Sequence, residues 1–147
     1  RVKRVREYIG NETFMLTYGD GLSDINLDDL LSFHKKHGKL VTLTAVKPPA
    51  KFGELEIEKD TVRHFHEKPK LETGWINGGY FVIEPEFFDY IDNDETLLER
   101  EPLENAAING QLMSFKHDGF WKCMDNVRDK KILETMIENQ EMPWLAK

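Results

Sequence analysis

The stretch FMLTYGDGLSDINLDDLL, residues 14–31, joins a short apolar run to an amphipathic segment through a corner of two glycines and an aspartate. An apolar run of this kind is typical of a strand that is covered on both faces in a parallel sheet. The amphipathic segment predicts a helix, which Asp24 or Asn26 can cap and Gly38 can end. A second run, residues 40–46, is rich in β-branched residues and predicts another strand. This order of strand, helix and strand indicates an α/β fold.

The rest of the chain continues this alternation, with no internal repeat and no obvious linker. Residues 54–58 alternate strictly between polar and apolar, and residues 61–65 follow a turn at positions 59–60, which predicts a hairpin with one solvent-facing side. Further strands are expected at 79–83 and 112–117, and helices at 2–9, 85–91 and 102–108 and from Val127 onward.

The composition is that of one globular domain. With 147 residues, 39% hydrophobic and 32% charged, the chain is large enough to bury a core. Its net charge of −7 argues against nucleic acid as a partner, because a phosphate backbone requires a basic surface. No apolar run approaches the roughly 18 residues of a membrane span, and the single Cys123 excludes an internal disulfide. We expect a cytoplasmic protein that binds neither nucleic acid nor membrane.

The amino end, RVKRVREYIG, has no initiator methionine and shows helical spacing from its first residues. Val2, Val5 and Ile9 share one face of the predicted helix, and Gly10 can end it. We therefore expect that sequence upstream of this chain has been removed.

Asp20 stands at the carboxyl end of the first predicted strand, between Gly19 and Gly21. Open α/β sheets bind their ligands at this end of the strands, and flanking glycines let the backbone approach a ligand closely. The alternative is an ordinary Asp-Gly turn, in which the carboxylate binds its own backbone.

Asp125 repeats this arrangement in FWKCMDNVRD, residues 120–129, where an expected strand runs into an aspartate just before a helix. Taken alone, this aspartate could simply cap the helix. Two such corners in one sheet could instead converge on a hard cation, since Mg²⁺ is commonly held by one or two carboxylates together with phosphates and water.

A third group of candidates lies in the segments FHEKP and INGGYF. Lys68 could neutralise a phosphate, and Glu67 could accept hydrogen bonds from sugar hydroxyls. Asn77 offers a donor and an acceptor, while Gly78 and Gly79 would let a ring lie against the backbone. The alternative is that the charged pair lies on the surface before a proline and that the glycines form a bend at the start of a strand.

With TYGDG, FHEKP, WINGGYFV, EREPLE and HDGFWKCMDNVRDKKILE in this order, the chain resembles the sugar-nucleotide pyrophosphorylases. The motifs GD, EKP and NGG recur across the sugar nucleotidyltransferases, and the last two stretches narrow the resemblance to the glucose-1-phosphate cytidylyltransferase branch. The resemblance implies a three-layer α/β/α nucleotide-diphospho-sugar transferase fold, which is Rossmann-like, with the hairpin as an addition.

In that family the enzyme makes CDP-glucose and pyrophosphate from CTP and glucose 1-phosphate with Mg²⁺. The resemblance implies that Asp20 and Asp125 bind the metal and that these two residues and Lys68 form the catalytic set. It also implies a homo-oligomer and a role in the deoxysugars of surface polysaccharides, such as the lipopolysaccharide O-antigen. The substrate-binding residues that it implies are Gly19, Glu67, Lys68, Asn77 and Gly78.

One family feature is absent from this chain: a glycine-rich loop of the form G-G-x-G-T-R-L, with a nearby lysine, which grips the nucleotide. Residues 1–147 therefore resemble the carboxyl-terminal part of one nucleotidyltransferase domain, and we expect this part alone to be inactive. Two alternatives remain open. The protein could use UTP or dTTP, or it could be a non-catalytic sugar-phosphate-binding or assembly domain.

Overall fold

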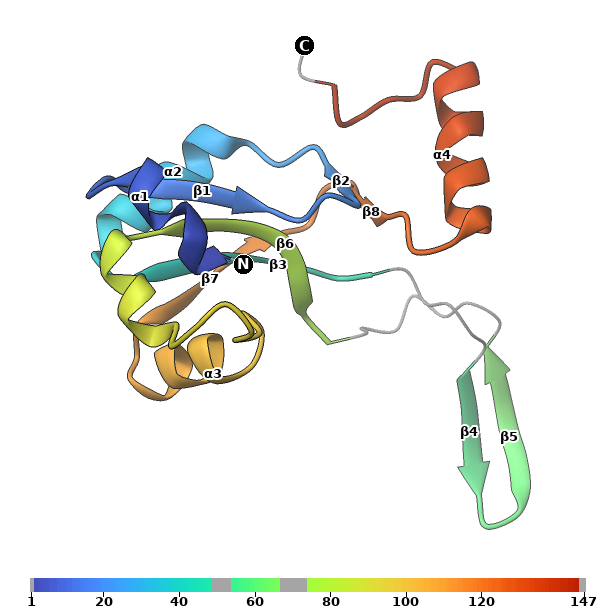
Figure 1. Ribbon diagram of the computed structural model, residues 1–147. Coiled ribbons are helices and arrows are strands. Elements are labelled where there is room, and N and C mark those ends of the chain that lie inside the picture. The colour runs from blue at the N-terminus through green and yellow to red at the C-terminus, as the bar shows by residue number, and fades with distance from the viewer. Residues whose placement is uncertain (1, 49–53, 67–73, 146–147) are drawn as a thin grey trace.

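The structure is built on one mixed sheet of four strands, β1 (Phe14–Thr17), β3 (Val41–Val46), β6 (Ile76–Ile83) and β7 (Leu112–His117). The computed structural model describes residues 2–48, 54–66 and 74–145. The strand order is β1-β6-β3-β7 (Figure 1). β6 is antiparallel to both β1 and β3, whereas β3 and β7 are parallel.

The predicted strand, helix and strand unit is confirmed, but the expected parallel sheet is wrong. α2 (Leu27–His37) connects β1 to β3, and β6 lies between these strands and runs antiparallel to both. β1 also leaves one face open, because Met15 is 45% exposed while Phe14 and Leu16 pack against the core. An apolar run indicates burial, and it does not specify the direction of the neighbouring strands.

Helices cover both faces of the sheet, so the expected α/β/α layering is confirmed (Figure 1). α2 packs against β3, β6 and β7 on one face. On the other face, the main core includes Val41, Phe81, Ile83, Phe87, Phe88, Leu103 and Ala106. The helices that contribute to this side are η1 (Val2–Val5), α1 (Arg6–Ile9), η2 (Pro85–Tyr90) and α3 (Glu101–Ile108).

The ends of α2 follow from its sequence. The Asn26 side chain accepts hydrogen bonds from the backbone N–H groups of Asp28 and Asp29 at 2.9 and 3.1 Å, so Asn26 rather than Asp24 is the N-cap. Gly38 adopts a left-handed conformation, with φ of 62°, and ends the helix as expected.

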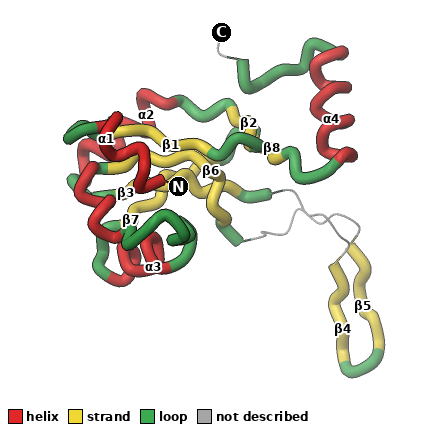
Figure 2. Tube along the Cα trace, in the orientation of Figure 1, coloured by secondary structure: helices red, strands yellow, loops and turns green. Residues whose placement is uncertain are grey.

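Two small antiparallel sheets complete the described fold (Figure 2). β4 (Glu54–Glu58) and β5 (Thr61–His66) confirm the predicted hairpin, with its turn at residues 59–60. β2 (Gly21–Ser23) and β8 (Trp121–Cys123) form a second ribbon, whose first strand the sequence did not predict. No helix within the described ranges combines the length and the apolar character that crossing a membrane requires.

A buried hydrogen-bond chain attaches α2 to the sheet. The Lys39 backbone N–H donates to Nδ1 of His37 at 2.9 Å, so the proton of a neutral His37 lies on Nε2, which donates to the Thr42 hydroxyl at 2.7 Å. That hydroxyl donates to Nδ1 of the fully buried His34 at 2.8 Å, and Nε2 of His34 donates to Glu84 at 2.9 Å. While His37 is neutral, each hydrogen bond in this series has a donor on one side and an acceptor on the other.

We expect His37 to make the fold sensitive to acid. Burial lowers the pKa of His37 below its ordinary value of 6.5, and electrostatic repulsion of its protonated form by its neighbours, Lys39 among them, lowers it further. The unfolded state therefore binds this proton first as the pH falls, so the contribution of His37 is complete above about pH 6.5 and is lost below it. Measuring the free energy of unfolding in urea at about pH 7.5 and about pH 5 checks this.

The matched variant is His37→Gln, whose amide can accept from Lys39 and donate to Thr42 but does not titrate. Its stability should fall less between the two pH values than that of the wild type. An equal fall in both proteins would show that His37 does not contribute.

Candidate functional site

The β2–β8 ribbon brings the two acidic corners together, although they lie far apart in the sequence. Gly21 pairs with Cys123, and the Met124 N–H donates a hydrogen bond to the Asp20 carbonyl at 2.8 Å. This backbone pairing places Asp20 beside the turn that carries Asp125.

A cavity of about 410 Å³ opens beside this ribbon, and both aspartates line it. Gly78 lines the same cavity, so the structure brings together three of the residues that the sequence singled out. The other lining residues are Tyr18, Gly21, Pro48, Ile76, Trp121 and Cys123.

The helix-cap alternative for Asp125 is wrong. α4 (Val127–Glu138) begins after Asn126, whose side chain accepts a hydrogen bond from the Asp129 N–H at 3.0 Å. Asn126 is therefore the N-cap. Asp125 lies one position earlier and accepts a hydrogen bond from the Cys123 thiol at 3.1 Å.

The Asp20 carboxylate is exposed at the rim of the cavity. No described residue forms a hydrogen bond with it, so the described part of the chain does not contain the bond to its own backbone that the turn alternative requires. The turn therefore does not account for the carboxylate.

The donor set at this cavity suits a hard cation that also binds a ligand. Asp20 and Asp125 supply carboxylate oxygens, and Mg²⁺ is commonly held by one or two carboxylates plus substrate phosphates and water. Within the described residues, no group of three or more histidine, cysteine or acidic side chains could hold a metal ion. A cation here would thus need ligand oxygens as well as protein oxygens.

Gly78 and Gly79 form an irregularity inside β6 rather than a bend before it. Across from β3, Leu43 pairs with Phe81 but Ala45 pairs with Asn77, so the register shifts over the glycines. Gly79 has a φ of 79°, which favours glycine. The alternative correctly gave the glycines a role in the backbone, but the irregularity lies inside β6 and not at the start of the strand.

Both glycines are also required by close packing. A Cβ on Gly78 would lie 2.8 Å from Cγ1 of Val46, and one on Gly79 would lie 2.7 Å from Cδ2 of Tyr18. The Gly78 carbonyl accepts a hydrogen bond from the Trp121 indole at 2.8 Å, which attaches β8 to β6.

The Asn77 side chain turns toward Tyr18. Its Oδ1 accepts from the Gly79 N–H at 2.9 Å, and its Nδ2 donates to the Tyr18 hydroxyl at 3.1 Å. That hydroxyl donates to Glu99 at 2.5 Å. Sequence reasoning missed Tyr18 and Glu99, although both lie in the motifs TYGDG and EREPLE that carried the resemblance.

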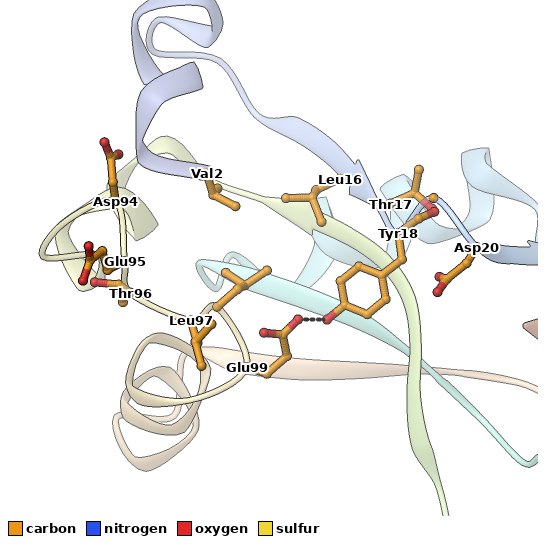
Figure 3. Close-up of a pocket in the computed structure, with 12 residues that line it drawn as sticks. Val2, Leu16, Thr17, Tyr18, Asp20, Asp94, Glu95, Thr96, Leu97 and Glu99 are labelled. Atoms are coloured by element: carbon orange, nitrogen blue, oxygen red, sulfur yellow. Dashed lines mark hydrogen bonds between the residues drawn. The ribbon is translucent and has the colours of Figure 1, made fainter. Parts of the chain in front are cut away.

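A second, larger cavity of about 1070 Å³ is also lined by Tyr18 (Figure 3). Gly19 and Asp20 line it together with residues 94–99, so Asp20 and Tyr18 belong to both cavities. Burial raises the pKa of Tyr18, and the hydrogen bond and charge of Glu99 raise it further. Tyr18 therefore keeps its proton and acts as a donor toward Glu99.

The far end of the ribbon is held by a second polar cluster. His117 Nε2 lies 2.9 Å from an Asp24 carboxylate oxygen, and the Ser23 hydroxyl donates to the Phe120 carbonyl at 2.9 Å. Gly119 packs so closely that a Cβ there would lie 2.5 Å from the same Asp24 oxygen. These contacts fix the loop that leads into β8.

Glu67 and Lys68 lie outside the described residues. Their predicted places on the sugar and its phosphate stay predictions, as does the binding of a ligand by Gly19, Asn77 and Gly78.

The sequence matches a known family over most of its length. The profile described as nucleotidyl transferase matches residues 2–126. The chain is 50% identical over 145 residues to the glucose-1-phosphate cytidylyltransferase of Salmonella typhi, and 50% identical over 145 residues to that of Salmonella typhimurium. The matches cover 98% of this chain and 56% of each relative, so the chain spans about half the length of the curated relatives it matches.

A solved structure supports the fold. The crystal structure of a candidate glucose-1-phosphate thymidylyltransferase from Bacillus anthracis superposes with a TM-score of 0.65 at 14% identity, over 92% of this chain and 58% of that one. The expected nucleotide-diphospho-sugar transferase fold is thereby confirmed.

We expect the glycine pair to be intolerant of substitution. Gly79→Ala places a methyl group against Tyr18 in a left-handed conformation, and it should lower the free energy of unfolding by about 1–3 kcal/mol. Urea unfolding measures the loss. The control is Gly74→Ala, because no described atom lies within 4 Å of a Cβ at that position. Equal stability of the two variants would contradict the packing role of Gly79.

Proposed function

The chain belongs to the nucleotidyl transferase family, and from that premise we propose that the protein carrying it makes CDP-glucose and pyrophosphate from CTP and glucose 1-phosphate. The observation that most directly supports this is that Asp20 and Asp125 line the same cavity. The chain is also 50% identical to relatives named glucose-1-phosphate cytidylyltransferase. Because the chain spans 56% of the length of those relatives, the proposal concerns the whole protein in which it occurs.

For this reaction, the protein must hold two polyanions, the triphosphate and the sugar phosphate, aligned for in-line attack. An oxygen of the sugar phosphate attacks the α-phosphorus of the triphosphate, and pyrophosphate leaves from the opposite side. The attacking phosphate is already ionised, so no strong base is needed. Asp20 and Asp125 would hold Mg²⁺, which when bound supplies positive charge to the reacting phosphates.

We assign the sugar side of the site to the substrate-binding residues that the sequence predicted. Asn77 and Gly78 would contact the sugar, and Gly19 lies where the backbone can approach the ligand. Glu67 would bind sugar hydroxyls and Lys68 would pair with the sugar phosphate. In a chain with a net charge of −7, such local cations are needed to attract anionic substrates.

The test is an assay of pyrophosphate release by the full-length protein with Mg²⁺, glucose 1-phosphate and each nucleoside triphosphate in turn. Turnover with CTP is the expected result. Turnover with UTP or dTTP alone would assign the protein to a sister enzyme. Absence of turnover with every nucleotide and sugar phosphate would contradict an enzymatic role and favour a sugar-phosphate-binding or assembly domain.

Asp20→Asn and Asp125→Asn in the full-length protein should each reduce turnover by about 100-fold or more, because each removes the charge that holds the cation. Both substitutions keep the size of the side chain, so the melting temperature should stay near that of the wild type. Asp118→Asn is the matched control, since Asp118 is an exposed aspartate that lines neither cavity. Near-normal Mg²⁺-dependent turnover in either test variant would remove that residue from the site.

A further inference from the structure

Three side chains from separate segments form a directed hydrogen-bond chain between the two cavities. Asn77 lies in β6, Tyr18 follows β1, and Glu99 precedes α3. The Asn77 amide donates to the Tyr18 hydroxyl at 3.1 Å, and this hydroxyl donates to Glu99 at 2.5 Å (Figure 3 shows the second bond). Tyr18 lines both cavities, and Glu99 lines the larger one.

The carboxylate of Glu99 at one end and the backbone N–H of Gly79 at the other set the direction of the bonds in this chain. An ionised carboxylate only accepts, so the single proton of the Tyr18 hydroxyl must point to Glu99. The Tyr18 oxygen is then an acceptor for Nδ2 of Asn77. At the other end, the Gly79 N–H donates to Oδ1 of Asn77 at 2.9 Å. A flipped amide would place two acceptors together at Tyr18 and two donors together at Gly79.

We propose that Glu99, acting through Tyr18, is a positioning residue that, together with the Gly79 N–H, holds the Asn77 amide in place for contact with a sugar hydroxyl. The inference rests on the proposed function, in which Asn77 contacts the sugar. An amide carries two N–H groups and two acceptor positions, so the bonds to Tyr18 and Gly79 leave one of each for a ligand. Asn77 lines neither of the two cavities, but the Tyr18 side chain to which its amide donates lines both.

The decisive variants separate the charge of Glu99 from its shape. Glu99→Gln keeps the size, but its amide can donate as well as accept, so Tyr18 is no longer oriented. Tyr18→Phe removes the link itself. In the full-length protein, each should raise the KM for glucose 1-phosphate by about 5- to 10-fold, the loss expected for one misplaced hydrogen bond. The KM for CTP and kcat should stay within about twofold of the wild type.

The double variant tests whether Glu99 acts only through Tyr18. Glu99→Gln added to Tyr18→Phe should change nothing further, because residues that act in series are not additive. Glu95→Gln is the matched control, since Glu95 is an exposed carboxylate on the same cavity wall. It should leave both KM values unchanged.

An absorbance titration of tyrosine tests the hydrogen-bond geometry without any turnover. Burial raises the pKa of Tyr18 most, and the Glu99 bond and charge raise it further, so one tyrosine should ionise at lower pH in Glu99→Gln than in the wild type. Glu95→Gln should give the wild-type curve. Superimposable curves for Glu99→Gln and the wild type would overturn the inference.

The kinetic measurements can also overturn the inference. An unchanged KM for glucose 1-phosphate in both single variants would overturn the positioning role. An effect of Glu99→Gln without one of Tyr18→Phe, or additive effects in the double variant, would mean that Glu99 touches the substrate directly, which also overturns it. Equal losses for CTP and sugar phosphate would show a merely structural role. A wild-type protein without turnover would contradict the proposed function itself, and the inference with it.

Discussion

The arrangement of the candidate site depends on Gly78 and Gly79 being glycines, because there is no room for a side chain at either position. Because β6 lies between β1 and β3, a Cβ on the first glycine would collide with Val46 and one on the second with Tyr18. Because neither residue has a side chain, the register can shift while β6 stays paired with both β1 and β3. The backbone groups of the two glycines then form hydrogen bonds with Trp121 and Tyr18, which come from distant parts of the chain, and with the adjacent Asn77.

The acidic corners are positioned by backbone rather than by their own side chains. Pairing of β2 with β8, and the bond from Met124 to the carbonyl of Asp20, place the two turns side by side. The carboxylates thereby remain at a cavity instead of being used as caps or turn ligands. Both carboxylates line the same cavity, as the proposed Mg²⁺ site requires.

Much of the fold could be predicted from local patterns. The apolar runs of β1 and β3 and the turn at residues 59–60 are local features that lie where the sequence placed them, and Asn26 is one of the two caps that the sequence offered. The direction of β6 could not be predicted, since a buried strand has the same composition whichever way its neighbours run. β2 is too short to carry a pattern, and it exists only because β8 pairs with it.

The sequence alone singled out residues that could carry chemistry, because Asp20, Asp125 and the glycine pair stand at breaks in the local pattern. Only the tertiary structure decided that Asp20, Asp125 and Gly78 share one cavity. It also revealed the hydrogen bond from Tyr18 to Glu99, which links the end of β1 to a loop far away in the chain. The physical reason is that turns and caps are set by neighbouring residues, whereas a hydrogen bond between distant segments exists only after the sheet has brought them together.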